Sequence, residues 1–161
     1  MSRTLKTCPT CGRRLIDGPD QSRTAKVGKF QVTIEGIPTR VCPAGCEGLY
    51  WYWRDLGVSV LDMTFSRPEY VARLRRGLFK SRQLCRECRL EIGEDWTVAT
   101  FRFEAKSPRG TLITMTATVP ALRCPGCGRL HMPAQTAPGD PYYADLAEAI
   151  SVALTDNLRW K

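Results

Sequence analysis

The sequence predicts an α+β fold: two β-hairpin units, each closed by cysteines, joined by a helical linker and followed by a C-terminal amphipathic helix. Three observations carry this prediction. The 8 cysteines fall into four close pairs. The spacers between the pairs are rich in strand-forming residues, and two helix-start signals lie outside the spacers. The predicted segments are hairpin units at 1–48 and 83–132, an aromatic and helical linker at 49–82, and a loop and helix at 133–161.

The second spacer shows the clearest strand pattern. From Thr111 onward, apolar and polar residues alternate, as in a strand with one buried face. Residues 96–105 are a second predicted strand, and Ser-Pro-Arg-Gly at 107–110 is the turn between the two. In the first spacer the predicted strands are 26–34 and 37–41. We therefore expect each spacer to fold as a hairpin.

Two cysteine pairs bracket each hairpin, which predicts one structural metal site per unit. Two tight turns can present four thiolates in a tetrahedron, the coordination that zinc prefers. A cross-brace between the first pairs of the two units would close longer loops at a higher cost in entropy, so it is disfavoured. We expect two zinc ions per chain, with iron, which rubredoxins hold between similar turns, as the alternative metal. The predicted ligand sets are Cys8/Cys11/Cys42/Cys46 and Cys85/Cys88/Cys124/Cys127.

Composition and charge bound the class of protein. No apolar run follows the basic N-terminal residues, and no segment is long and apolar enough to span a membrane. We therefore expect a cytoplasmic protein with reduced cysteines rather than a secreted one with disulfides. The formal net charge of +8 suits a partner that carries phosphate or acidic groups.

A capping pattern predicts the linker helix. Ser66 would be the N-cap, Glu69 would complete the capping box, and the helix would run to Phe79. Residues 73–89 hold seven basic residues and one acidic residue. Such a stretch is either a solvated face or a phosphate-binding element, and both interpretations remain open. The residues assigned to nucleic-acid binding are Arg73, Arg76, Lys80, Arg82, Arg86 and Arg89.

Aromatic residues cluster at Tyr50-Trp51-Tyr52-Trp53. Burial in the core is the favoured interpretation, and a stacking platform or an anchor for a partner protein is the alternative. Further on, Asp140-Pro141 predicts the start of a helix that runs to Asn157 with one apolar stripe. The single histidine, His131, is expected to be structural or on the surface, because four cysteines already complete each tetrahedron.

The first half resembles the YgiT/MqsA-type zinc-finger family. The resemblance rests on C-P-T-C-G at Cys8, the 30 residues between Cys11 and Cys42, and V-T-I-E-G-I-P at 32–38. It covers about residues 5–48 and extends more weakly to 85–128. It implies structural zinc on the first cysteine set and binding of a toxin protein by the ribbon. Two features depart from the family: the C-x-x-x-C spacing of the second pair, and the lack of a helix-turn-helix pattern after the ribbons.

These patterns lead to two main functional hypotheses. The favoured one is a non-enzymatic interaction protein, antitoxin-like or a regulatory adaptor, with a protein partner that could be a toxin. The alternative is a nucleic-acid-binding zinc-ribbon protein that uses the basic stretch. A thiol redox enzyme ranks third, because catalytic dithiols occur singly rather than as four pairs. We assign no catalytic or organic-cofactor residues, since the sequence carries none of the familiar catalytic motifs.

Overall fold

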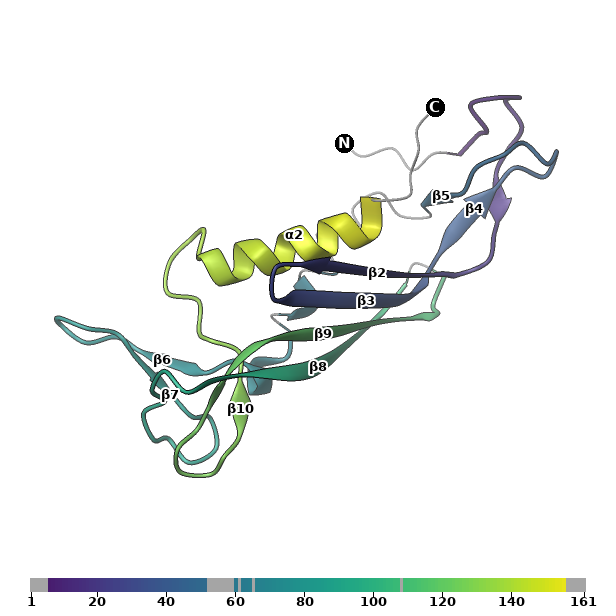
Figure 1. Ribbon diagram of the computed structural model, residues 1–161. Helices are drawn as coiled ribbons and strands as arrows, with labels where there is room; N and C mark the ends of the chain where they lie inside the picture. The colour runs from purple at the N-terminus through teal and green to yellow at the C-terminus, as the bar shows by residue number, and fades with distance from the viewer. Residues whose placement is uncertain (1–5, 52–59, 61, 65, 108, 156–161) are drawn as a thin grey trace.

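The computed structural model describes residues 6–51, 60, 62–64, 66–107 and 109–155 (Figure 1). Its main feature is an antiparallel sheet that contains two hairpins, β2–β3 and β8–β9, together with β10. One edge of β9 pairs with β8 along almost its full length, and the other edge pairs with β3 and then β10. β2 pairs with the outer edge of β3. The strands are β2 (Gln21–Val27), β3 (Phe30–Ile37), β8 (Trp96–Lys106), β9 (Leu112–Arg123) and β10 (Leu130–His131).

The two hairpins meet edge to edge through β3 and β9. Ile34 lies opposite Met115 in this pairing, and both side chains are fully buried. Alternate residues of β3, β8 and β9 point to one face of the sheet, as the period of two in a strand requires. The predicted strands at 96–105 and from Thr111 are therefore confirmed, and the two units share one hydrophobic core.

A C-terminal helix, α2 (Pro141–Thr155), covers the β2 and β3 part of this sheet. The Asp140 carboxylate accepts a hydrogen bond from the Tyr142 backbone N–H at 3.1 Å, so the predicted N-cap is present. The predicted end at Asn157 lies outside the described residues. The apolar stripe is buried as expected, with Tyr143, Leu146, Ala149, Ile150, Ala153 and Leu154 inside.

The predicted position of the first hairpin is wrong. Its arms are β2 and β3, joined by a two-residue turn in which Gly28 has φ +57°. Two-residue turns favour glycine at this position, so the turn lies earlier than the predicted break after residue 34. Gly36, at φ +72°, lies near the end of β3, where a Cβ would clash with the Leu112 carbonyl oxygen. The chain continues into a separate three-stranded sheet of β1 (Ile16–Asp17), β4 (Thr39–Val41) and β5 (Tyr50–Trp51).

The predicted helix from Ser66 to Phe79 is also wrong. Only a 3₁₀ turn, η1 (Pro68–Tyr70), forms there, and the Ser66 hydroxyl donates to the Met63 carbonyl instead of capping. The chain then enters a hairpin of β6 (Arg73–Arg75) and β7 (Arg82–Leu84). A helix would have brought several cations together on one face and placed Gly77 in its interior, and both are unfavourable.

Arg109 links the turn of the second hairpin to the first unit. Its guanidinium donates to the carbonyl oxygens of Gly18, at 3.1 Å, and Thr39, and lies 3.5 Å from Asp20. The side chain is 15% exposed. This contact adds to the β3–β9 pairing and joins segments that are far apart in the sequence.

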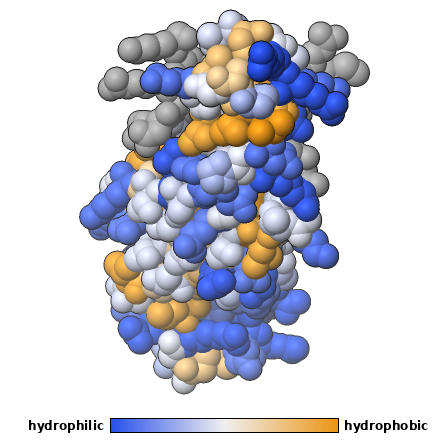
Figure 2. All heavy atoms as spheres, turned by 90° about the vertical axis from the view of Figure 1, so that its right-hand side faces the viewer, coloured by the Kyte–Doolittle hydropathy of each residue, from blue (hydrophilic) through white to orange (hydrophobic). Residues whose placement is uncertain are grey.

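None of the helices in the described part of the chain has the length and apolar character needed to cross a membrane. Figure 2 views the molecule from the end opposite the β6–β7 hairpin, where hydrophobic residues form separate groups among hydrophilic ones.

Candidate metal centres

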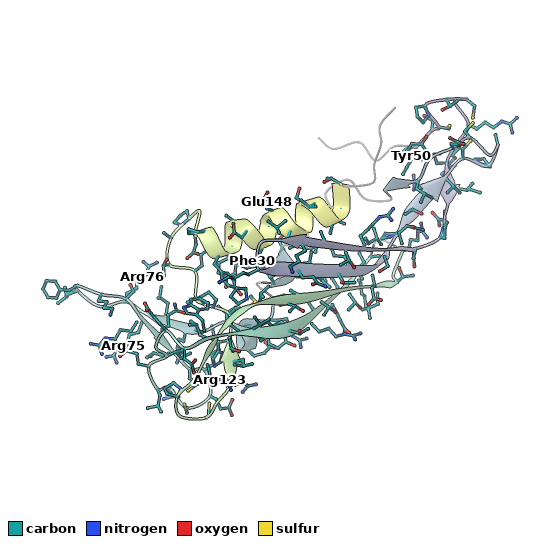
Figure 3. The ribbon with its side chains drawn as sticks, viewed as in Figure 1. Phe30, Tyr50, Arg75, Arg76, Arg123 and Glu148 are labelled. Carbon is teal, nitrogen blue, oxygen red and sulfur yellow. The ribbon has the colours of Figure 1, made fainter. Side chains whose placement is uncertain are left out.

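The structure brings the 8 cysteines together in two groups of four. The first centre is Cys8, Cys11, Cys42 and Cys46, and the second is Cys85, Cys88, Cys124 and Cys127. These are the two sets predicted from the spacing, not the cross-brace. The centres lie at opposite ends of the molecule, the first beyond β4 and β5 and the second beside β10 (Figures 1 and 3).

The sulfur positions fit tetrahedral coordination. Within each centre all four sulfurs lie within 4.8 Å of one another. The sulfur–sulfur distances are 3.4 Å for Cys11–Cys42 and 3.4 Å for Cys88–Cys124. A tetrahedron with metal–sulfur bonds of about 2.3 Å has an edge of about 3.8 Å. Each centre can therefore hold one metal ion with small adjustments, and four cysteine ligands suit zinc or iron.

Short turns present the cysteines. The Gly12 N–H donates to the Cys8 carbonyl at 2.8 Å, and the Gly128 N–H donates to the Cys124 carbonyl at 2.9 Å. Both glycines have φ +72°, and Arg89 takes the same place after Cys88 with φ +63°. In the longer C-P-A-G-C turn the positive φ moves to Gly45, before the last cysteine. That shift accommodates the extra residue.

The electrostatics of each centre favour a bound cation. Burial raises the pKa of Cys8, but backbone N–H donors of Cys11 and Thr10 outweigh it and hold the pKa at about 6. Hydrogen bonds with Cys11 and Cys42 raise the pKa of Cys46 to about 12. Four neighbouring thiolates repel one another, so in the absence of a cation some of the thiols keep their protons. A dication would replace those protons.

In the second centre, too, the pKa of one cysteine is lowered and that of another is raised. Burial raises the pKa of Cys124, but the backbone N–H groups of Cys127 and Gly126 outweigh it and hold the pKa at about 6. The Arg129 backbone N–H lowers the pKa of Cys127. The hydrogen bond between the Cys127 and Cys85 side chains and the burial of Cys127 raise it, and the pKa is about 12 overall. Each centre thus contains at least one thiol with a lowered pKa and at least one with a raised pKa.

His131 distinguishes the second centre from the first. It is fully buried, and its Nε2 lies 3.3 Å from the Cys85 sulfur. Burial lowers the pKa of His131, followed by the positive charges of Arg129 and Arg86, so the neutral ring is favoured. A neutral ring that donates Nε2–H to the Cys85 thiolate would stabilise it from outside the coordination sphere. The C-G-R-L-H sequence after the last cysteine gives no local signal of this contact, which depends on the β10–β9 pairing.

The basic stretch is divided between two structures. Arg73, Lys80 and Arg82 belong to the β6–β7 hairpin and its loop, whereas Arg86 and Arg89 lie in the turn of the second centre. Figure 3 shows Arg75, Arg76 and Arg123 at the same end of the molecule, away from Tyr50. Folding thus keeps most of these cations near one metal centre, on a hairpin rather than on a helix.

The aromatic cluster is described only in part. Tyr50 packs beside the buried residues of the first metal centre, which fits the favoured interpretation that it belongs to a core. Residues 52 and 53 lie outside the described residues, as does the side chain of Trp51.

Comparison of the chain with protein-family models, curated proteins and solved structures finds no significant match. The resemblance to the YgiT/MqsA-type family therefore stays a prediction.

Proposed function

We propose that this chain is a non-enzymatic zinc-binding protein whose two structural four-cysteine sites support a β-sheet scaffold, and that its basic hairpin binds nucleic acid. The basic hairpin is residues 73–84, that is β6, β7 and the loop between them. The second metal centre and the hairpin act together in this proposal, since one leads directly into the other.

The charge of the basic hairpin is the observation that carries the proposal. It contains no acidic residue, and its five cations are all exposed. Arg82 pairs with Glu91 at 3.3 Å. In the part of the chain that the structure describes, no ion pair is seen for the other four. The five cations are Arg73, Arg75, Arg76, Lys80 and Arg82.

The pairing within the hairpin strengthens the argument. Arg75 lies directly opposite Arg82 across the two strands. Like charges in this arrangement are destabilising, and an anionic ligand would reverse the sign of the effect. A polyanion such as DNA or RNA supplies closely spaced phosphates to several cations at once. Charge of one sign along a protruding ribbon is therefore better suited to nucleic acid than to a single carboxylate.

The root of the hairpin is fixed at the second metal centre. β7 ends at Leu84, and the next residue is the ligand Cys85. Ala72, just before β6, is 1% exposed and packs with Cys85, Ile92, Leu122 and Cys124. Zinc bound at this centre would hold the hairpin in one direction, which reduces the entropy lost on binding.

A protein partner is the second candidate. The family resemblance of the first half favours an antitoxin-like or adaptor role, and two exposed apolar residues at the hairpin tip, Leu78 and Phe79, would suit an anchor. The anchor residues predicted from the sequence, Tyr50 to Trp53, provide less support, because Tyr50 packs at the first centre.

The test is a salt titration of binding to a labelled duplex and a labelled single strand. If the five cations neutralise about five phosphates on duplex DNA, log affinity should fall against log salt with a slope of roughly −4 to −5. The variant Arg73→Glu/Arg76→Glu/Lys80→Glu should lose binding at physiological salt. The matched control, Arg13→Glu/Lys26→Glu/Lys106→Glu, reverses the same number of exposed charges elsewhere and should retain most of it.

Either of two results would contradict nucleic-acid binding. One is the absence of binding to both probes by the zinc-loaded wild type. The other is an equal loss in the two triple variants, which would indicate attraction to net charge alone. Capture of a single protein through Leu78 and Phe79, with the charge reversals affecting only the association rate, would favour the second candidate.

A further inference from the structure

The tip of the basic hairpin exposes two large apolar side chains. Leu78 is 97% exposed and Phe79 is 101% exposed. The turn that presents them is tight at Gly77, where a Cβ would lie 2.7 Å from the Lys80 carbonyl oxygen. Single exposed apolar residues are ordinary, but two adjacent ones at the end of a protruding hairpin form a small exposed apolar patch.

Cations flank this tip on both strands. Arg75 and Arg76 precede it, and Lys80 and Arg82 follow it. These residues and the tip line an open hollow of about 390 Å³. The tip is thus apolar at its end and positively charged on both sides.

We infer that the basic hairpin enters a groove of duplex DNA and that Phe79 and Leu78 insert between base pairs at its floor. This inference rests on the proposed function and goes further, because it assigns the tip a role that charge alone cannot provide. Apolar side chains that enter a base step unstack it and bend the duplex, and the bent duplex can then contact more of the protein.

The arrangement of charge favours a duplex over a single strand. A groove has a row of phosphates on each side, which matches cations on both strands of the ribbon. A two-stranded β-ribbon can occupy a groove of duplex DNA, and apolar side chains that open a base step do so from the minor groove. A single strand offers one row of phosphates and would leave the cations of one strand without contacts.

The length of the charged ribbon argues against a lipid surface. Arg73 lies five residues before Leu78, which corresponds to roughly 15 Å of strand. A flat layer of lipid headgroups would meet the cations near the tip but not those at the root. Phosphates along a groove can contact the ribbon over its full length.

The experiment uses the zinc-loaded full-length chain and a duplex of about 25 base pairs with a fluorescence donor and acceptor at its ends. Wild type should raise energy transfer as the duplex bends, and 2-aminopurine placed in the duplex should brighten as it is unstacked. Phe79→Ala should weaken duplex binding roughly tenfold and abolish both signals, because one inserted aromatic ring is lost. Phe79→Trp should restore both signals.

A matched control separates insertion from general apolar contact. Val98→Ala removes an apolar side chain that is 62% exposed on β8, so it should leave affinity and bending unchanged. If wild type binds the duplex but Phe79→Ala changes neither the affinity nor the bending of the duplex, the proposed insertion of Phe79 is wrong. The proposed binding of nucleic acid is then unaffected. Tighter binding to the matching single strand would also overturn the proposed insertion. If wild type binds neither DNA probe but binds vesicles rich in phosphatidylserine, both this inference and the proposed function are wrong.

Discussion

At the scale of single residues, the position directly after the second cysteine has a positive φ in three of the four cysteine turns. Gly12 and Gly128 adopt a positive φ after the second cysteine of their turns, and Arg89 adopts it without being glycine. That conformation costs an L-residue roughly 1 kcal/mol or more. Arg89 adds a cation next to Cys88 despite this cost, which is consistent with our proposal that this end of the molecule binds nucleic acid.

His131 provides the prediction at this scale. In the described part of the chain, His131 is the one side chain other than a cysteine that is seen hydrogen-bonded to a sulfur of the second centre, and His131→Ala removes it. We expect its metal affinity to fall about 10- to 100-fold, the usual effect of losing such a partner. Competition with a chromophoric chelator would measure it, and one of the two metal equivalents should weaken. The first centre serves as the control within the same molecule. Equal weakening of both equivalents, or of neither, would contradict this role.

At the scale of elements, α2 stabilises the part of the sheet that the metal centres do not reach. Its buried side chains belong to the same core as β3 and β9, and Tyr142 donates from its hydroxyl to the Pro120 carbonyl at 2.8 Å. Phe30 meets Tyr142 edge-on at a centroid distance of 4.9 Å. The helix is thus an integral layer of the fold.

Leu146→Ala tests the contribution of this helix. The side chain is fully buried, so its truncation should lower the free energy of unfolding by about 2–5 kcal/mol. The control is Glu148→Ala on the exposed face of the same helix (Figure 3), which should change it by about 0.5 kcal/mol or less. Urea unfolding of the zinc-loaded proteins would give both values. A small effect of Leu146→Ala would mean that α2 undocks before the sheet unfolds.

At the scale of the whole molecule, one sheet connects two ends that each carry four cysteines able to hold a metal ion. The sheet core consists mainly of residues from β3, β8, β9 and α2, whereas the cysteines belong to two smaller clusters at the ends. The scaffold therefore has a centre held by apolar burial, and we expect the stability of its two ends to depend on metal binding.

Hydrogen exchange after removal of one metal site would test this division. Cys11→Ser should remove protection mainly in residues 6–19 and 39–51, and Cys88→Ser mainly in residues 82–95 and 122–132. β3 and the middle of β9 should stay protected in both variants, because their side chains belong to the central core. Loss of protection throughout the chain in either variant would indicate that metal binding and sheet formation are one cooperative unit.

Local patterns in the sequence were sufficient for several elements. The alternation in residues 112–119 identified β9, the Asp140 cap and apolar stripe identified α2, and the pair spacing predicted which cysteines meet. Each of these signals depends on residues that are close in the chain or on a short turn. The Val-Gly-Lys-Phe turn at 27–30 was equally local, and recognising it would have placed β2 and β3 correctly.

Only the tertiary structure decided the rest. The pairing of β3 with β9 joins residues about 80 positions apart, and no local periodicity specifies which strand edges meet. The contact of His131 with Cys85 depends on a different pairing, that of β10 with β9, and joins residues 46 positions apart. The stretch after Ser66 carries a helix-capping pattern. In the folded chain β6 pairs with β7, and Ala72 just before β6 packs against the second centre. These contacts outweigh a weak helical preference. The sequence by itself thus determined the chemistry of the two centres, whereas long-range pairing determined their placement and turned a predicted helix into the basic hairpin.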